Sequence, residues 1–386
     1  MVTIESVAEK NARKAESLAA FSGVKLLHIK NSVAELLRQI GGHGIFEQYT
    51  RHDISHIDSM LQSLDWIIPE ASKGELKPAD WLLVVLAIYL HDLGLLVTKN
   101  EFERRDLSAF REFCEQVLFA GEDGIDYRDK VDRLPPDERE RFLYQDFVRA
   151  KHAERIKYWV IGKAHDSLGV STEVVSEIDL LLRDIDPVLR RDLAFICESH
   201  HLDDLNDLRK YKTRQPYGPT PGETANLQYC AILLRSADLL HITRDRTPSV
   251  AFRTLNPSDP VSQQEWAKQM AVRAVRPQLG RDKDGNLSPS AAQDTVEIHA
   301  FFQAEEGFFG LTSYLKYAAK ELKKSNTWID AAKQTDGVNV SFPWKHIDDS
   351  FIETEGFLNE PFEFTLDQAK ILDLLTGHSY TMRRAL

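Results

Sequence analysis

The apolar run WLLVVLAIYL at residues 81–90 constrains the fold most, because it leads directly into His91 and Asp92 and then into Gly94. The run is about half the length that a membrane-spanning helix needs, so we expect a helix buried in a globular core. Such a helix carries an imidazole and a carboxylate into the interior, where unpaired polar groups are costly. A divalent metal offsets this cost by binding both groups. A hydrogen-bonded His–Asp pair is the alternative that this segment leaves open.

Further titratable side chains lie on other predicted helices. His52 and His56 are four residues apart and therefore share one face of a helix. Asp238 lies in the apolar stretch LLRSADLL, where a carboxylate without a cation is unfavourable. His152 and His200 occupy similar helical settings. Any one of these histidines is as readily a satisfied core or surface residue, but the ordered set favours a metal site.

The composition limits the class of protein. The chain has 386 residues, 42% hydrophobic and 28% charged, which is typical of a folded globular protein. A formal charge of -12 opposes binding of extended nucleic acid but is compatible with a small anion in a local basic pocket. Three widely spaced cysteines without a CxxC motif argue against a disulfide framework. The N-terminus lacks the basic start and apolar stretch of a secretory signal, so we expect a cytoplasmic protein without a membrane segment.

The pattern of apolar residues changes character near residue 250. Helical periodicity dominates residues 1–250, whereas alternation typical of strands appears in residues 251–386. We predict a mainly α protein, with an all-helical domain over 1–250, leading helices within 1–44, and a smaller α+β appendage over 251–386. A stretch rich in Pro, Gly, Ser and Asp at 276–294 is expected to be a mobile loop. The predicted helices after the leading ones cover 45–68, 79–93, 101–119, 138–168, 173–182, 188–200 and 222–242, and the predicted strands cover 295–302, 337–342 and 362–365.

The order of these residues resembles that of the HD superfamily of metal-dependent phosphohydrolases, which are all-helical. The flanking segments YTRHDISH, AIYLHDLG, VRAKHAER and RSADLL resemble its HD-CE branch, which is linked to bacterial conflict systems and suggests a role in antiphage defence. The matching positions here are His56, His91 with Asp92, His152, His200 and Asp238.

The resemblance extends into the appendage. The segments SYLKY at 313–317, TEGF at 354–357 and ILDLLTGH at 371–378 resemble the region that joins HD-CE domains to a following GHKL-type ATPase. It implies that an ATPase is a separate partner, is absent, or belongs to a longer form of the protein.

The resemblance also implies the metal ligands, which are His56, His91, Asp92 and Asp238. One divalent metal is the first expectation, with Mn or Mg favoured over Fe, Co or Ni. A second metal could bind through His152 and His200, which could instead act on substrate phosphates, and His201 is the alternative to His200. His52 is assigned to support of the ligands or to substrate contact.

Catalytic roles follow from the same comparison. Asp92 is expected to orient the attacking water, and a histidine that titrates near neutrality suits the proton donor. His152 is the first candidate for that donor, with Glu154 weaker and His200 as a further catalytic residue. Basic side chains that could clamp a polyphosphate are Lys151, Arg155, Arg235, Arg244 and Arg246.

Among the reactions of the superfamily, triphosphate removal from deoxynucleoside triphosphates ranks first, because an acidic chain with local Arg and Lys suits a small polyanion. A phosphodiesterase of cyclic nucleotides or oligonucleotides is the alternative enzyme. A nucleotide-sensing regulatory subunit of an ATPase-containing complex is the alternative of a different class. A metalloprotease is disfavoured, because Asp53 stands where the HExxH motif has Glu. We also expect a nucleotide effector, and a homo-oligomer or a complex with a defence partner.

Overall fold

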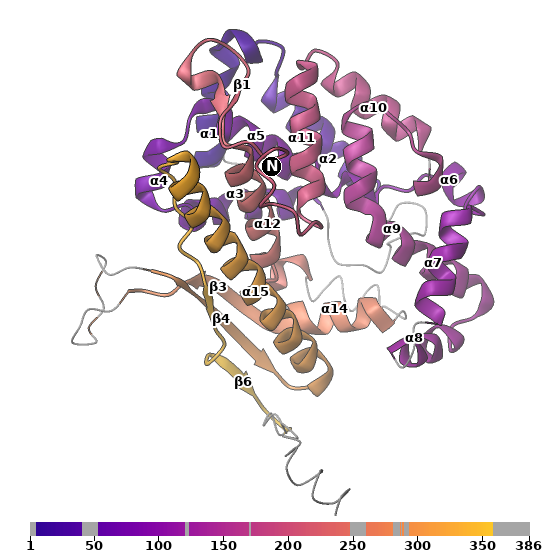
Figure 1. Cartoon of the computed structure of the whole chain (residues 1–386). Helices are drawn as coiled ribbons and strands as arrows, with labels where there is room; N and C mark the ends of the chain where they lie inside the picture. The colour runs from indigo at the N-terminus through magenta and orange to yellow at the C-terminus, as the bar shows by residue number, and fades with distance from the viewer. Residues whose placement is uncertain are drawn as a thin grey trace, which may run out of the picture.

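The computed structural model describes residues 5–40, 53–119, 123–169, 171–247, 260–280, 286, 288 and 293–357. Helices make up most of this part of the chain, and a small sheet belongs to its C-terminal region (Figure 1). The predicted mainly α class with a smaller C-terminal α+β region is confirmed.

Helix α5 (Pro78–Leu90) is the central element of the bundle. Pro78 opens it, and Asp80 Oδ2 accepts a hydrogen bond of 2.8 Å from the backbone N–H of Lys77, which caps the first turn. Every residue from Ala79 to the end of the helix is buried. By length and composition alone the segment Pro78–Leu95 could cross a membrane, but 94% of it is buried inside the fold. It is therefore a core helix.

Five helices pack directly on α5, and α9 packs on the short 3-10 turn η3 (His91–Leu95) that follows it. A smaller apolar cluster, with Phe110 and Phe147 among its members, lies between α7 and α9. The predicted helix over 101–119 is broken into α6 and α7. The helices on α5 are α1 (Val7–Ala12), α2 (Leu26–Leu37), α3 (Ile54–Ile67), α11 (Pro187–Ser199) and α12 (Leu227–Leu240), and the others are α4 (Glu70–Glu75), α6 (Lys99–Glu103), α7 (Ser108–Leu118), α8 (Asp123–Asp132), α9 (Pro136–Val160) and α10 (Thr172–Leu182).

The described part of the C-terminal region has one long helix, one shorter helix and a sheet. Strand β4 is the centre of the sheet: β3 pairs with it antiparallel, and β5 and β6 pair with it parallel. The predicted strand at 295–302 is confirmed. In chain order the elements are α14 (Pro260–Ala271), β3 (Val272–Pro277), β4 (Thr295–Phe302), α15 (Glu305–Asp336), β5 (His346–Asp348) and β6 (Ile352–Thr354), and a separate small pair is formed by β1 (Gln215–Pro216) and β2 (Thr224–Ala225).

The predicted strand at 337–342 is wrong. Side-chain burial does alternate from Val338 to Phe342, but the backbone hydrogen bonds go to side chains of the helices. The backbone N–H of Ser341 donates to Ser72 Oγ at 2.8 Å, and Asn326 Nδ2 donates to the carbonyl of Phe342 at 2.6 Å. The segment pairs with none of the described strands. The predicted strand at 362–365 and most of the predicted loop at 276–294 lie outside the described residues.

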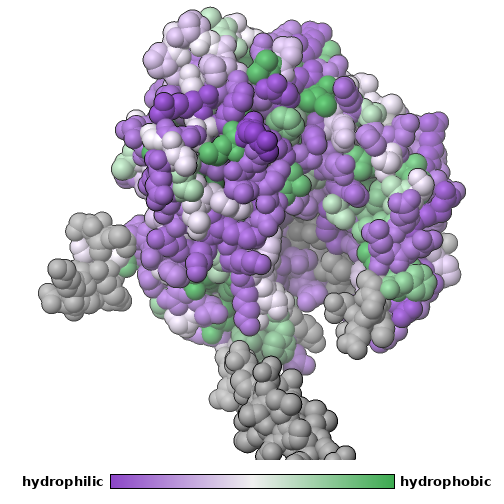
Figure 2. All heavy atoms as spheres, viewed as in Figure 1, coloured by the Kyte–Doolittle hydropathy of each residue, from purple (hydrophilic) through white to green (hydrophobic). Residues whose placement is uncertain are grey.

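The helical and C-terminal regions share one hydrophobic core. Leu86 and Leu234 of the bundle belong to the same cluster of buried side chains as Leu311 and Phe342 of the C-terminal region. Hydrophilic residues cover most of the face seen in Figure 2, and the hydrophobic ones form small groups. A division into two domains near residue 250 stays a prediction.

Candidate metal centre

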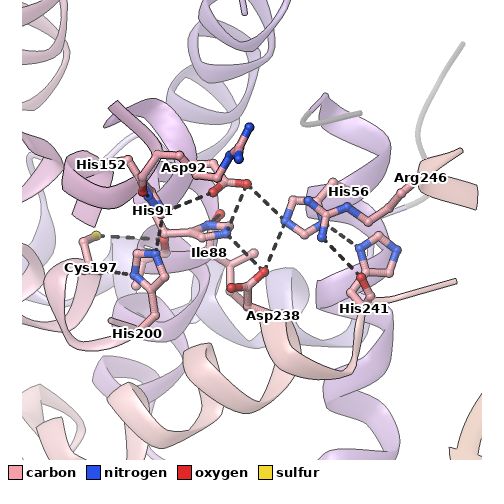
Figure 3. A network of polar contacts seen from close by, with 12 residues as sticks. His56, Ile88, His91, Asp92, His152, Cys197, His200, Asp238, His241 and Arg246 are labelled. Atoms are coloured by element: carbon pink, nitrogen blue, oxygen red, sulfur yellow. Dashed lines mark hydrogen bonds and ion pairs between the residues drawn. The ribbon is translucent and has the colours of Figure 1, made fainter. Parts of the chain in front are cut away.

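Four side chains from three helices converge inside the bundle (Figure 3). His56 lies in the first turn of α3, His91 and Asp92 follow α5, and Asp238 lies near the end of α12. His56 Nε2 is 3.2 Å from Asp92 Oδ2 and 3.7 Å from Asp238 Oδ1, and His91 Nε2 is 3.4 and 4.0 Å from the same two oxygens. The ligand atoms of His56, His91 and Asp238 lie within 4.8 Å of one another, so this group can hold a metal ion.

A second group lies on the other side of Asp92. It comprises His152 of α9 together with His200 and His201, which follow α11, and its ligand atoms also lie within 4.8 Å of one another. Asp92 Oδ1 is 3.9 Å from His152 Nε2, while Asp92 Oδ2 faces the first group. The Asp92 carboxylate therefore lies between the two groups.

The close approach of α9 depends on Gly94. A Cβ atom at this position would lie 2.0 Å from the carbonyl oxygen of His152, which is far inside van der Waals contact. Only a residue without a side chain lets the two backbones approach this closely. Gly94 thus allows His152 to lie beside the His91–Asp92 doublet.

Three of the histidines are oriented in the same way. In His91, His152 and His200, Nδ1 lies 2.9, 2.7 and 2.5 Å from the carbonyl oxygen of the residue three positions earlier. A carbonyl oxygen only accepts, so each Nδ1 carries the proton and donates it. In the neutral ring Nε2 is then an acceptor, and in all three residues it faces the centre.

The donor set fits a cation. The Nε2 atoms of His152 and His200 face each other at 2.9 Å, although both are acceptors in the neutral rings. Burial lowers the pKa of both rings well below the ordinary value, and neighbouring histidines add to the effect, which disfavours a proton between them. His91 Nε2 is buried and makes no hydrogen bond within the described part of the chain. A metal ion satisfies these lone pairs.

His241 supports the first group. Its Nδ1 lies 2.5 Å from His56 Nδ1, and the two rings are stacked with centroids 4.7 Å apart. A proton on His56 Nδ1 that is donated to His241 leaves His56 Nε2 as the acceptor that faces Asp92. Burial lowers the pKa of His56 well below its ordinary value, and the Arg246 guanidinium lowers it further. Both effects keep the ring neutral, as a metal ligand must be.

A cavity of about 390 Å³ opens onto both groups. Asp92, His152, His200, His201 and Asp238 line it, and His56 and His91 lie next to Asp92 and Asp238 without lining it. We call these His and Asp side chains together the floor of the cavity. Its wall consists of Lys268 and Gln269 from α14 and Tyr314 and Tyr317 from α15, with Glu265 of α14 beside them. Arg149 and Arg246 line the cavity as well. The C-terminal region therefore contributes one side of the candidate site.

The structure corrects the predicted substrate contact of Arg155. This guanidinium is fully buried, and Nη1 donates to Glu101 Oε1 at 2.6 Å and to the carbonyl of Leu168 at 2.7 Å, while Nη2 donates to the carbonyl of Leu96 at 2.7 Å. These partners tie α9 to α6 and to the loops around it. Arg155 holds the core together and does not reach the cavity.

Arg235 requires the same correction. Its side chain is 5% exposed, Nη2 lies 2.5 Å from Glu321 Oε2, and Nη1 donates to the carbonyl of Leu202 at 2.6 Å. The pair joins α12 to α15 and fixes the backbone next to His201. Arg235 therefore connects elements around the site instead of contacting substrate.

The remaining predicted residues have different positions. Lys151 and Glu154 are about 40% exposed, lie 3.6 Å from each other, and do not line the cavity. Their predicted roles in substrate binding and proton transfer therefore lack structural support. Arg244 is exposed in the short turn before Arg246, and its role stays a prediction. His52 lies outside the described residues.

Sequence reasoning missed His241 and the whole wall. His241 follows Asp238 by three residues, and this spacing of about one helical turn is the sequence signal that indicates His241. Tyr314 and Tyr317 lie in SYLKY, which the sequence assigned to a joining region and not to the site, and Lys268 and Gln269 lie in a segment without a recognised motif. The wall residues meet the floor only through tertiary packing.

A helical bundle with a histidine–aspartate centre is the class that this fold and site define. Residues 46–324 match the model of the HD-CE family. The match covers more than half of the chain, and the protein belongs to the HD-CE family, which places it among the HD-type phosphohydrolases. No curated protein and no solved structure matches the chain.

Proposed function

We propose that this protein is a metal-dependent triphosphohydrolase that splits deoxynucleoside triphosphates into deoxynucleoside and triphosphate. The observation that carries the proposal is the pair of His/Asp groups on the floor of a cavity that basic side chains also line. Membership of the HD-CE family supports hydrolysis of a phosphate ester.

We assign the metal ligands among the floor residues as follows. His56, His91 and Asp238, with the predicted ligand Asp92 beside them, would hold one divalent cation. His152 with His200 would hold a second, with Mn²⁺ or Mg²⁺ as the first choices. A divalent cation supplies Lewis acidity, which polarises phosphoryl oxygens and makes water more acidic.

Asp92 is the residue that we assign to the attacking water. Its two oxygens face the two groups, so the carboxylate is placed to accept a hydrogen bond from a water near either one. His152 suits a ligand better than the predicted proton donor, because its proton is on Nδ1, which donates to the carbonyl of Arg149. In the neutral ring its Nε2 has no proton to give.

The size and charge of the cavity support a small polyanion as substrate. A volume of about 390 Å³ lies in the range of small-molecule sites, about 300–1,000 Å³. The chain carries a formal charge of -12, yet Arg149, Arg246 and Lys268 gather around this cavity. Asp92, Asp238 and Glu265 also line the cavity, so its lining is mixed in charge. Divalent cations on the floor would offset these carboxylates and leave the basic side chains for the phosphates of a nucleotide.

One observation favours a nucleotide-sensing subunit as the second candidate. Lys324 of α15 lies 2.8 Å from Asp203, two residues after His201, and 3.0 Å from Glu321. Together with the Arg235–Glu321 pair, these contacts join α15 to the segment that carries His200 and His201. A change in the position of His200 or His201 would then shift α15 through these contacts.

The test is product analysis with a panel of deoxynucleotides, ribonucleotides and cyclic nucleotides, in Mn²⁺ or Mg²⁺, for the wild type and the His91→Ala/Asp92→Ala double variant. We expect metal-dependent release of triphosphate from deoxynucleoside triphosphates, and loss of that release in the double variant. His165→Ala is the matched control, because this histidine is exposed and does not line the cavity.

Two results would overturn the favoured reaction. Conversion of cyclic nucleotides to nucleoside monophosphates, without release of triphosphate from deoxynucleotides, would identify a phosphodiesterase. Absence of products from a protein that binds both metal and nucleotide would leave the sensing subunit.

A further inference from the structure

The wall of the cavity comes from the region that sequence reasoning treats as an appendage. Lys268 and Gln269 are consecutive residues of α14, and Tyr314 and Tyr317 lie one turn apart on α15. All four line the same cavity as Asp92 and Asp238. They differ from the floor in chemistry, since they offer an ammonium, an amide and two aromatic rings.

We propose that this wall is the specificity side of the substrate site, where Tyr317 stacks on the nucleobase, Gln269 accepts a hydrogen bond from the nucleoside, and Lys268 contacts the phosphates. The proposal rests on nucleotide hydrolysis at the same cavity and names the substrate as a nucleoside triphosphate rather than an inorganic polyphosphate.

Lys268 presents a cation that is held in place. Its side chain is 7% exposed, its Nζ lies 2.7 Å from Glu265 Oε1, and it lies 4.5 Å from the centroid of the Tyr314 ring. The Tyr314 hydroxyl donates to the carbonyl of Leu239 at 2.7 Å, which joins the wall to the residue after Asp238. An ammonium fixed in this way beside a cavity suits a phosphate oxygen.

Gln269 presents a buried acceptor to the cavity. The residue is 3% exposed, and its Nε2 donates to Glu265 Oε2 at 3.3 Å, whereas its Oε1 has no hydrogen-bond partner among the described residues. A buried acceptor without a donor is costly. A sugar hydroxyl or an exocyclic amine of a nucleoside supplies such a donor, whereas inorganic triphosphate that is fully ionised on divalent cations does not.

Tyr317 offers a flat surface to the ligand. It is 47% exposed, and its ring centroid lies 6.4 Å from that of Tyr314. Aromatic rings at the edge of a polar site stack on bases of any sequence. Phe309 is a matched control on the same helix, since it is 52% exposed and does not line the cavity.

The experiment compares the binding of deoxyadenosine triphosphate and inorganic triphosphate by calorimetry with Mn²⁺. An Asp92→Asn background limits turnover and leaves the group of His56, His91 and Asp238 intact. We expect Tyr317→Ala and Gln269→Leu to weaken nucleotide binding about tenfold and to leave inorganic triphosphate unchanged. Lys268→Gln is expected to weaken both ligands by about tenfold, and Tyr317→Phe to restore nucleotide binding.

The controls separate this inference from the proposed reaction. Phe309→Ala should bind both ligands as the background does. Equal binding of nucleotide by Tyr317→Ala and by the background would overturn the role of the wall, while hydrolysis by the wild type could still hold. Tyr317-dependent binding without any hydrolysis by the wild type would overturn the proposed reaction and leave the wall as a nucleotide site.

Discussion

The floor and the wall of the cavity are held in different ways. On the floor, His91, His152 and His200 are buried, and backbone carbonyls of their own helices fix the proton on each ring. On the wall, side-chain contacts hold Lys268, and Tyr317 is half exposed. The floor is thus set by the backbone of the bundle, whereas the wall is set by side chains on two helices of the C-terminal region.

Because of this difference, substitutions on the floor and on the wall should have different effects. A change on the floor alters the donor set and should abolish chemistry, because one lost ligand cannot be replaced by a neighbour. A change on the wall should alter which ligand is preferred and by how much. Substitutions on the floor and on the wall therefore test this distinction.

The largest effect is expected for His91→Ala. Loss of this ligand should lower hydrolysis by about a thousandfold or more, because metal-ion catalysis contributes several kcal/mol and each 1.36 kcal/mol is about tenfold. Rates should be measured together with metal content by elemental analysis, with His165→Ala as the control. Full activity with unchanged metal content would show that His91 is not a metal ligand.

The next effect is expected for Gly94→Ala, which tests whether backbone spacing sets the floor. The added methyl group would meet the carbonyl of His152, so unfolding free energy should fall by about 1–3 kcal/mol. Urea denaturation measures this loss, and metal content should fall with it. In Gly74→Ala the new Cβ meets nothing within 4 Å, so this helical position should gain up to about 1 kcal/mol. Equal stability of both variants would contradict the close approach.

A smaller effect is expected for His241→Ala, because His241 orients a ligand and does not itself bind. Removal of such a partner weakens metal affinity by about 10–100-fold. Titration of the metal-free protein with Mn²⁺ should show the weakening. An unaltered affinity would mean that His56 keeps its orientation without His241.

The smallest effect is expected for Lys324→Met, which loosens the contact between α15 and the segment after His201. Lys324 is 27% exposed and its partner Asp203 is 64% exposed, so stability should change by less than about 1 kcal/mol. Urea denaturation measures that change, and kinetic assays should show kcat unchanged with a modest shift in KM. A large loss of kcat would show that the floor depends on α15.

Much of the fold and of the floor can be predicted from the sequence. Residues 81–90 are too apolar for anything but a buried helix, and the cost of burying His91, Asp92 and Asp238 without a partner indicates a cation. These inferences depend on local patterns, namely periodicity, apolar context and the order of residues along the chain.

The errors concern charges whose partners are distant in sequence. Arg155 pairs with Glu101 and Arg235 with Glu321, and no local pattern shows that such a guanidinium will be buried. The segment 337–342 alternates as a strand does, but helix side chains satisfy its backbone. Long-range packing decided each of these cases.

The opposed nitrogens of His152 and His200 also bear on the lifetime of the protein. Two acceptors at 2.9 Å repel each other, and a cation held by both rings would remove that repulsion, so we expect the metal-free chain to be the less stable form. A cation at about one hundred times its dissociation constant stabilises the native state by about 2.7 kcal/mol. Metal supply would then set the fraction of chains exposed to proteolysis, and a cell that withholds the metal would lose the protein as well as its activity.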